Sequence, residues 1–258
     1  MLSRILLFLL AGLGFFLCVP AGHAGDPPQE LPDGWKMVWH DEFEGSALDL
    51  AKWTPADAAY KKNNELQYYT PEDVYVRDGH LTLRSQRRRM EKRFFTSGLV
   101  DTKGKFSLTS GRVEVRARLP KGQGIWPAHW MMPADGSWPP EIDIAELLGH
   151  FPDKVHMTHH FRMPDGSARK HGEVFRGPDF SKDFHVFAVE WERDEIRWYI
   201  DRQLRFKSRD NVPSAPMQII LNTAVGGDWP GEPTSKTVFP QHHDIDYVRV
   251  YTRDPQAQ

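Results

Sequence analysis

The stretch PPEIDIAELLG, residues 139–149, places three carboxylates among isoleucines and leucines at spacings of two and three. In a β-strand successive side chains point to opposite faces, so Glu141 and Asp143 share one face while the isoleucines occupy the other. Unbroken alternation would put Glu146 on the isoleucine face, where an unpaired carboxylate is costly to bury. One extra residue in a β-bulge near Ala145 would return Glu146 to the face of the other acids. The stretch therefore predicts a bulged strand with one apolar and one acidic face.

The rest of the chain contains many short segments of period two and no long segment with apolar residues at helical spacing. Asp78-Gly79, for example, is typical of the turn between two strands. The pattern predicts an all-β fold, a sandwich of two antiparallel sheets formed by a single domain over residues 35–254, after a flexible leader at residues 25–34. The expected strands lie within residues 74–85, 111–120, 155–161, 184–191, 196–206, 217–225 and 245–252.

The first residues have the features of a signal peptide. Arg4 precedes an apolar run over residues 5–19, and small residues lead up to a cleavage site after Ala24. A transmembrane anchor is the less favoured alternative, because the run is short of the ~20 residues that a spanning helix needs. We therefore expect a secreted or periplasmic protein with no membrane association after cleavage. The only cysteine, Cys18, lies in this segment, so the mature chain is expected to lack disulfides.

The net charge of the chain is −2, which gives no general attraction to nucleic acid or to anionic membranes. Residues 84–93, RSQRRRMEKR, are the exception, since they are rich in arginine and contain one acid. This segment is either a solvated hairpin tip or a patch that steers an anionic polysaccharide toward the protein. No nucleic-acid partner is expected, and a monomer is the default.

The spacing of the acids indicates a possible reaction. With the bulge, Glu141 and Glu146 lie about four strand steps apart, roughly 13 Å of backbone. A concave sheet would bring the carboxyl groups within the ~5–5.5 Å that retaining glycosidases use, where one carboxylate attacks the anomeric carbon and the other protonates the leaving oxygen. Asp143, between them, could hydrogen-bond to one of the pair. The alternatives are an exposed acidic face and a cation site.

Aromatic residues near the acids favour a carbohydrate ligand. Trp126, Trp130 and Trp229 lie in segments rich in Gly and Pro that read as turns, and flat apolar rings are partners for the C–H faces of sugars. Core packing is the alternative for each tryptophan. Asn63 and Asn64 could hold sugar hydroxyls through their amide groups.

Several of these segments resemble glycoside hydrolase family 16, the group of laminarinases, lichenases, agarases and carrageenases. The resemblance spans roughly residues 35–252. It implies a β-jelly-roll sandwich with a carbohydrate cleft on the concave sheet, Glu141 as the nucleophile, Asp143 as its helper and Glu146 as the acid/base. The segments that carry the resemblance are NNELQYYT, SGRVEVRARLPKGQGIWPAHWMMP, EIDIAELLG, IILNTAVGGDWPG and DYVRVY.

The same resemblance implies further site residues. Positions that line the subsites in the family correspond here to Asn64, Arg112, Trp126, Trp130 and His160. Two alternatives stay open, namely that His160 is an ordinary strand histidine and that Arg112 pairs with a nearby acid, Glu114 or Asp143.

The family also commonly carries a structural calcium on the convex side, and the resemblance places its ligands at Glu42, Gly79 and Asp246, which offer the oxygen atoms that a hard cation prefers. No cofactor is expected for catalysis. Pro140 and Leu99 depart from the family pattern near the cleft, which leaves the sugar and its linkage open.

These observations predict a secreted, endo-acting, retaining glycoside hydrolase that resembles β-1,3- or β-1,3-1,4-glucanases and has a β-glucan or galactan as its polysaccharide substrate. A transglycosylase that uses the same covalent intermediate is one alternative. A non-catalytic carbohydrate-binding protein is the other.

Overall fold

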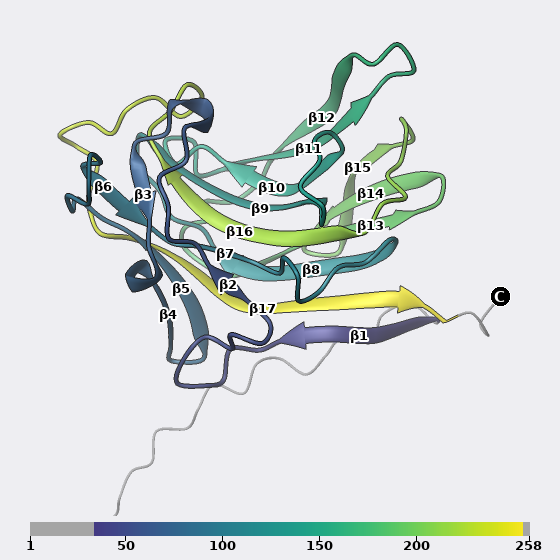
Figure 1. The fold of residues 1–258 in the computed structure, drawn as a ribbon, viewed down its shortest axis with the longest axis horizontal. Coiled ribbons are helices and arrows are strands. Elements are labelled where there is room, and N and C mark those ends of the chain that lie inside the picture. The colour runs from purple at the N-terminus through teal and green to yellow at the C-terminus, as the bar shows by residue number, and fades with distance from the viewer. Residues whose placement is uncertain (1–33, 255–258) are drawn as a thin grey trace, which may run out of the picture.

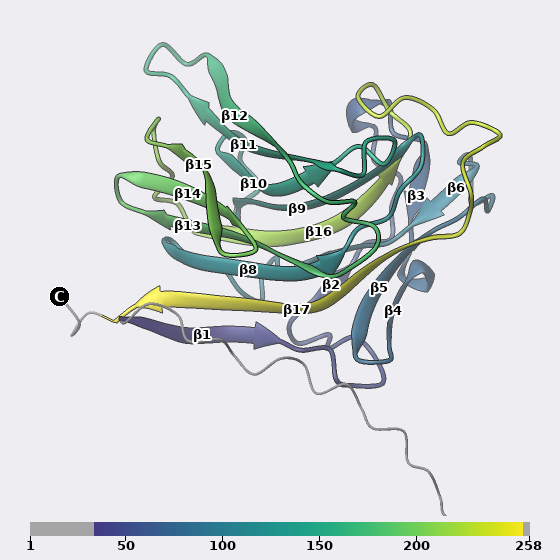
Figure 2. The ribbon, with the colours of Figure 1, turned by 180° about the vertical axis from the view of Figure 1, so that it is seen from behind.

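The computed structural model describes residues 34–254, which form two stacked, curved sheets (Figures 1 and 2). The predicted signal peptide, Cys18 and most of the predicted leader lie outside the described residues. Among residues 34–254, no helix has both the length and the apolar character needed to cross a membrane.

The upper sheet in Figure 1 has seven strands in antiparallel order β12-β11-β10-β9-β16-β7-β2, and it carries the acidic strand near its middle. Its strands are β2 (Thr54–Pro55), β7 (Leu99–Asp101), β9 (Ile125–Pro133), β10 (Glu141–Leu147), β11 (Lys154–Arg162), β12 (Ala168–Arg176) and β16 (Met217–Val225). The hairpin of β11 and β12 rises at one end of this sheet.

The lower sheet has eight strands, of which seven follow the order β15-β14-β13-β8-β17-β5-β4, while β1 also pairs with β17. Its strands are β1 (Trp35–Asp41), β4 (Val74–Arg77), β5 (His80–Ser85), β8 (Gly111–Arg118), β13 (His185–Glu192), β14 (Glu195–Ile200), β15 (Gln203–Ser208) and β17 (Gln241–Arg253). A short parallel pair, β3 (Gln67–Tyr69) and β6 (Phe95–Ser97), and the 3-10 turns η1 (Lys62–Asn64) and η2 (Pro71–Asp73) complete the fold.

This arrangement confirms the predicted all-β jelly-roll sandwich. The hairpin around Asp78-Gly79 is present as β4 and β5. The tryptophans Trp126 and Trp130, however, lie inside strand β9 and not in turns, four residues apart on one face. Strand β12 was not predicted, because almost all its residues are exposed and its sequence shows no alternation.

The core lies between the two sheets and is built from the apolar faces of their strands. Trp191 and Trp198 of the lower sheet are fully buried in it. Two buried histidines also join the sheets, since Nε2 of His129 in β9 lies 2.8 Å from Nε2 of His243 in β17. Burial lowers the pKa of both imidazoles, so both are neutral near pH 7, and one nitrogen donates to the other.

The predicted bulge in the acidic strand is confirmed. Opposite β11, Asp143 pairs with Thr158 and Glu146 pairs with His156, so three residue steps on β10 face two on β11. Ala145 is buried with the isoleucines, whereas Glu146 is partly exposed on the opposite face. The indole Nε1 of Trp198 donates to the carbonyl oxygen of Asp143 at 2.8 Å, which ties the bulge to the lower sheet.

Deleting Ala145 is expected to destabilise the protein and to abolish activity. Restored alternation would turn Glu146 toward the core and Leu147 away from it, at a cost on the order of several kcal/mol, unless the strand shifts its register. The substitution Ala145→Gly keeps the chain length and serves as the control. Urea unfolding and turnover would be measured for both, and a deletion variant with wild-type stability and wild-type rate would show that the bulge is not needed.

Candidate active site

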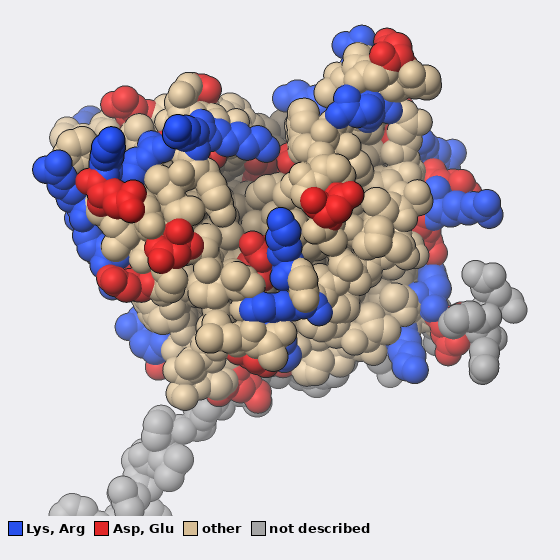
Figure 3. Space-filling view, in the orientation of Figure 1, with Lys and Arg blue, Asp and Glu red and all other residues tan. Residues whose placement is uncertain are grey.

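A cavity of about 810 Å³ lies over the face of the seven-stranded sheet that is turned away from the core. Strand β12 forms one wall, and the segment from Tyr60 to Glu65 forms the other. Trp229 also lines the cavity. Figure 3 shows the hollow between two raised parts of the surface. The acids of β10 lie on the floor of this cavity.

All three acids of the bulged strand line the cavity. Asp143 is nearly fully buried, while Glu141 and Glu146 on either side of it are partly exposed. The bulge therefore places three carboxyl groups on one face of one strand, as the sequence pattern predicts, and leaves the two outer ones accessible to a ligand.

Burial raises the pKa of Asp143 well above its usual range, and the charge of Glu141 raises it further. Both effects favour the protonated form of Asp143, which can donate a hydrogen bond to the carboxylate of Glu141. Burial also raises the pKa of Glu146 well above its usual range, with smaller effects from Asp143 and Glu141, which favours the protonated form that can act as an acid.

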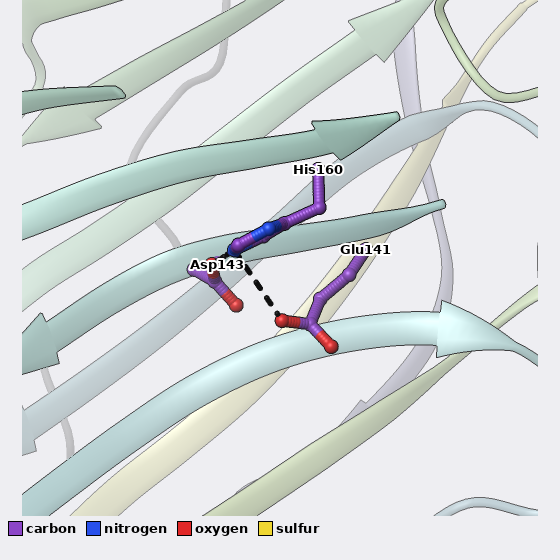
Figure 4. A group of neighbouring side chains, drawn as sticks. All are labelled: Glu141, Asp143 and His160. Atoms are coloured by element: carbon purple, nitrogen blue, oxygen red, sulfur yellow. Dashed lines mark ion pairs between the residues drawn. The ribbon is translucent and has the colours of Figure 1, made fainter. Parts of the chain in front are cut away.

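His160 reaches from β11 toward two of these acids. Its Nε2 lies 3.2 Å from Oδ2 of Asp143 and 3.6 Å from Oε1 of Glu141 (Figure 4). Burial lowers the pKa of the imidazole, so it is mainly neutral at pH 7. Within the described part of the chain, these three residues are the only cluster of acids and histidines close enough to hold a metal ion, and an ion there would occupy both carboxyl groups.

Two tryptophans hold the outer acids in place. Nε1 of Trp126 donates to Oε1 of Glu146 at 3.0 Å, and Nε1 of Trp138 donates to Oε2 of Glu141 at 3.1 Å. Trp138 was not among the predicted site residues, although its place directly before Pro139-Pro140 and the first acid was a signal that could have identified it. Each outer acid therefore has one indole donor.

The other predicted tryptophans also line the cavity. Nε1 of Trp130 donates to the side-chain oxygen of Asn222 at 2.8 Å, which fixes the indole against the floor. Trp229 makes an edge-to-face contact with Trp126, with ring centroids 5.3 Å apart. The rings lie where a sugar chain could stack along the cleft.

Two predicted ligand-binding residues lie elsewhere. Arg112 is in β8 of the other sheet, where its guanidinium forms buried ion pairs with Glu114 and Glu190, so its assignment to the cleft is wrong. The alternative of pairing with Glu114 is the one observed. Asn64 does not line the cavity. Its amide donates to Asp228 at 2.9 Å, and its neighbour Asn63 lines the cavity instead.

The residues assigned to calcium are engaged with arginines. Both carboxylate oxygens of Glu42 accept from Arg249, at 2.9 and 2.8 Å. Asp246 accepts from Arg116 at 2.5 Å. These guanidinium groups neutralise both carboxylates, and the calcium site stays a prediction on which no step of the chemistry depends.

The basic segment at residues 84–93 is largely satisfied within the protein. Arg84 and Arg88 pair with Asp73, and Arg93 donates to the backbone carbonyls of Glu65 and Tyr60. Most arginines of this segment therefore hold loops together. As a whole, the segment is neither a solvated hairpin tip nor a patch that steers a polysaccharide.

Comparison with known proteins gives a consistent set of relatives. Residues 59–249 match the sequence pattern described as glycosyl hydrolases family 16. A beta-glucanase from Rhodothermus marinus is 40% identical over 245 residues, which cover 84% of this chain and 85% of that protein. Glucan endo-1,3-beta-glucosidase A1 from Niallia circulans is 36% identical and covers 88% of this chain, but the chain spans only 39% of that protein.

A solved structure shows the same fold. The catalytic domain of an endo-1,3-beta-glucanase (laminarinase) from Thermotoga petrophila RKU-1 matches with a TM-score of 0.79 and 38% identity. The match covers 85% of this chain and 98% of that chain.

Proposed function

Because the chain belongs to family 16 of the glycosyl hydrolases, we propose that it is a secreted, endo-acting hydrolase that cleaves a β-linked glucan or galactan with retention of configuration. The observation that carries this proposal is the bulged strand β10, which presents Glu141 and Glu146 on one cleft face with Asp143 between them. The names of the relatives, a beta-glucanase and an endo-1,3-beta-glucosidase, favour a β-1,3- or β-1,3-1,4-glucan.

The geometry supports a two-step reaction. In the first step the carboxylate of Glu141 attacks the anomeric carbon, the glycosidic bond breaks, and Glu146 gives its proton to the leaving oxygen. In the second step Glu146, now a carboxylate, takes a proton from water, and the water oxygen displaces Glu141 from the sugar. The protonated form of Asp143, which burial favours, can donate a hydrogen bond to the carboxylate of Glu141 and so stabilise it as the leaving group of the second step.

Trp126→Phe is expected to shift the basic limb of the pH profile of kcat/KM to higher pH. Glu146 must be protonated to act as the acid, so activity is lost as the pH rises through its pKa. The indole hydrogen bond favours the charged form and lowers that pKa, so its removal raises the pKa. Trp229→Phe, which changes the ring in edge-to-face contact with Trp126, is the control. An unchanged basic limb in Trp126→Phe would show that the pKa of Glu146 does not determine that limb.

Product analysis on a panel of β-glucans and β-galactans tests the proposed function. We expect new reducing ends and a mixture of oligosaccharides early in the reaction, as internal cleavage gives. Products longer than the substrate would instead indicate a transglycosylase. Binding without any product from the whole panel would indicate a carbohydrate-binding protein and would contradict the proposal.

A further inference from the structure

Three lysines line the cavity without an acidic partner. Lys61 and Lys62 lie on one wall, and Lys170 lies in β12 on the other. All three are exposed, and within residues 34–254 none of them forms a salt bridge. Most charged residues of the opposite sheet, by contrast, are paired. In Figure 3 a row of Lys and Arg side chains runs along the upper surface toward the hollow.

Lys170 lies next to the Glu141 end of the acidic strand. In the strand ladder Lys170 pairs directly with His160, and His160 pairs directly with Glu141. Directly paired residues point to the same face, with Cβ atoms about 5 Å apart. Lys170 therefore lies on the cavity side of β12, next to His160.

Lys62 approaches the same end from the other wall. Its Nζ lies 5.6 Å from the ring centroid of Trp138, the indole that donates to Glu141. Lys62 and Lys170 both lower the pKa of Asp143 and of His160, so the positive charges of both walls act on the same groups.

The acids of the walls do not neutralise these lysines. Glu65 accepts from Gln67 at 2.7 Å and from Asn63 at 3.2 Å, and Glu173 accepts from the backbone of Val174 at 3.0 Å. Burial favours the protonated, uncharged form of Asp143 on the floor. At this end of the cleft the Glu141 carboxylate therefore supplies one negative charge against two ammonium groups, and a neutral sugar would offer them only hydroxyls.

We propose that the substrate carries an anionic substituent, a sulfate ester or a carboxylate, on the sugar that binds at the Trp138 end of the cleft, and that Lys62 and Lys170 bind this group from opposite walls. The inference rests on the proposed function and narrows it to a charged polysaccharide. A charge-assisted hydrogen bond from either lysine would also orient the sugar ring against the Trp138 indole.

Matched pairs of polymers test this inference. One pair is a sulfated β-galactan and its chemically desulfated form, and the other is a uronate-bearing β-glucan and its carboxyl-reduced form. The measured quantity is the ratio of kcat/KM for the charged polymer to that for its neutral form. The pair with the larger ratio identifies the anionic group. Rising salt concentration should lower the ratio, because ions screen exposed charges.

Lys62→Gln and Lys170→Gln are each expected to lower that ratio about tenfold, the effect of losing one hydrogen bond to a charged group. Lys62→Arg, which keeps the charge, should retain most of the ratio. Lys92→Gln is the matched control, since Lys92 is exposed and does not line the cavity. Calorimetric binding of charged and uncharged oligosaccharides to the Glu141→Gln protein provides a readout that does not depend on turnover.

The outcomes separate the two proposals. Cleavage of neutral polymers with ratios near one, unchanged by either lysine variant, would overturn the anionic substrate and leave the hydrolase intact. Equal losses on charged and neutral polymers would also overturn it, because the lysines would then act only on the acids. Failure to cleave any polymer, charged or neutral, would overturn the proposed function itself.

Discussion

Glu141→Gln is expected to lower kcat by several orders of magnitude on every substrate that the wild-type protein cleaves. The amide has the shape of the carboxylate but cannot attack the anomeric carbon, so the covalent step is lost. Glu141 is partly exposed on the cavity floor and Trp138 can still donate to the amide oxygen, so the free energy of unfolding should change little. Steady-state turnover and thermal unfolding would be measured together.

The cavity offers a matched control for this substitution. Glu173 lines the same cavity from β12, and its carboxylate accepts a hydrogen bond from the backbone N–H of Val174 in its own strand. Glu173→Gln should therefore change turnover no more than an ordinary surface substitution does. Near wild-type turnover for Glu141→Gln would show that Glu141 is not the nucleophile.

Glu146→Ala should produce the second large effect. It is expected to lower the rate on polysaccharide by several orders of magnitude, because the leaving sugar oxygen needs the proton of Glu146. The leaving group of an activated aryl glycoside needs no such proton, so the covalent intermediate still forms. Water then reacts with the intermediate slowly, because the variant lacks the base that accepts the proton of the water. Azide needs no base and should restore the rate, giving a β-glycosyl azide.

The azide result distinguishes the two acids. The same treatment of Glu141→Ala leaves no nucleophile on the protein, so any azide product there would form by direct displacement and have the α configuration. A β-azide from Glu141→Ala and none from Glu146→Ala would reverse the two assignments.

Sequence patterns predicted the bulged strand because alternation and burial are local properties. Glu146 can join the other acids only if one residue is added near Ala145, and burial of the isoleucines fixes which face is which. The strands of period two follow from the same rule. Strand β12 could not be predicted by this rule, because an edge strand exposed on both faces has no burial pattern to detect.

The residues that sequence reasoning placed wrongly depend on contacts between distant segments. The family resemblance assigned Arg112 to the cleft, but Arg112 pairs across the sheet with Glu190 of β13, and no local pattern shows which sheet a strand joins. Trp138 donates to Glu141 from a turn, and Lys170 pairs with His160 from an edge strand; the pattern around Glu141 describes neither segment. The raised pKa of Asp143 likewise depends on its burial in the folded chain, which no local pattern shows.

The anomeric configuration of the first product tests the central claim most directly, that Glu141 forms a bond to the sugar. Proton NMR would follow the hydrolysis of a β-linked oligosaccharide from the first minutes, before mutarotation mixes the anomers. Two displacements at one carbon restore its configuration, so the account predicts the β-anomer as the first product. The α-anomer as the first product would mean a single displacement by water and would contradict the account.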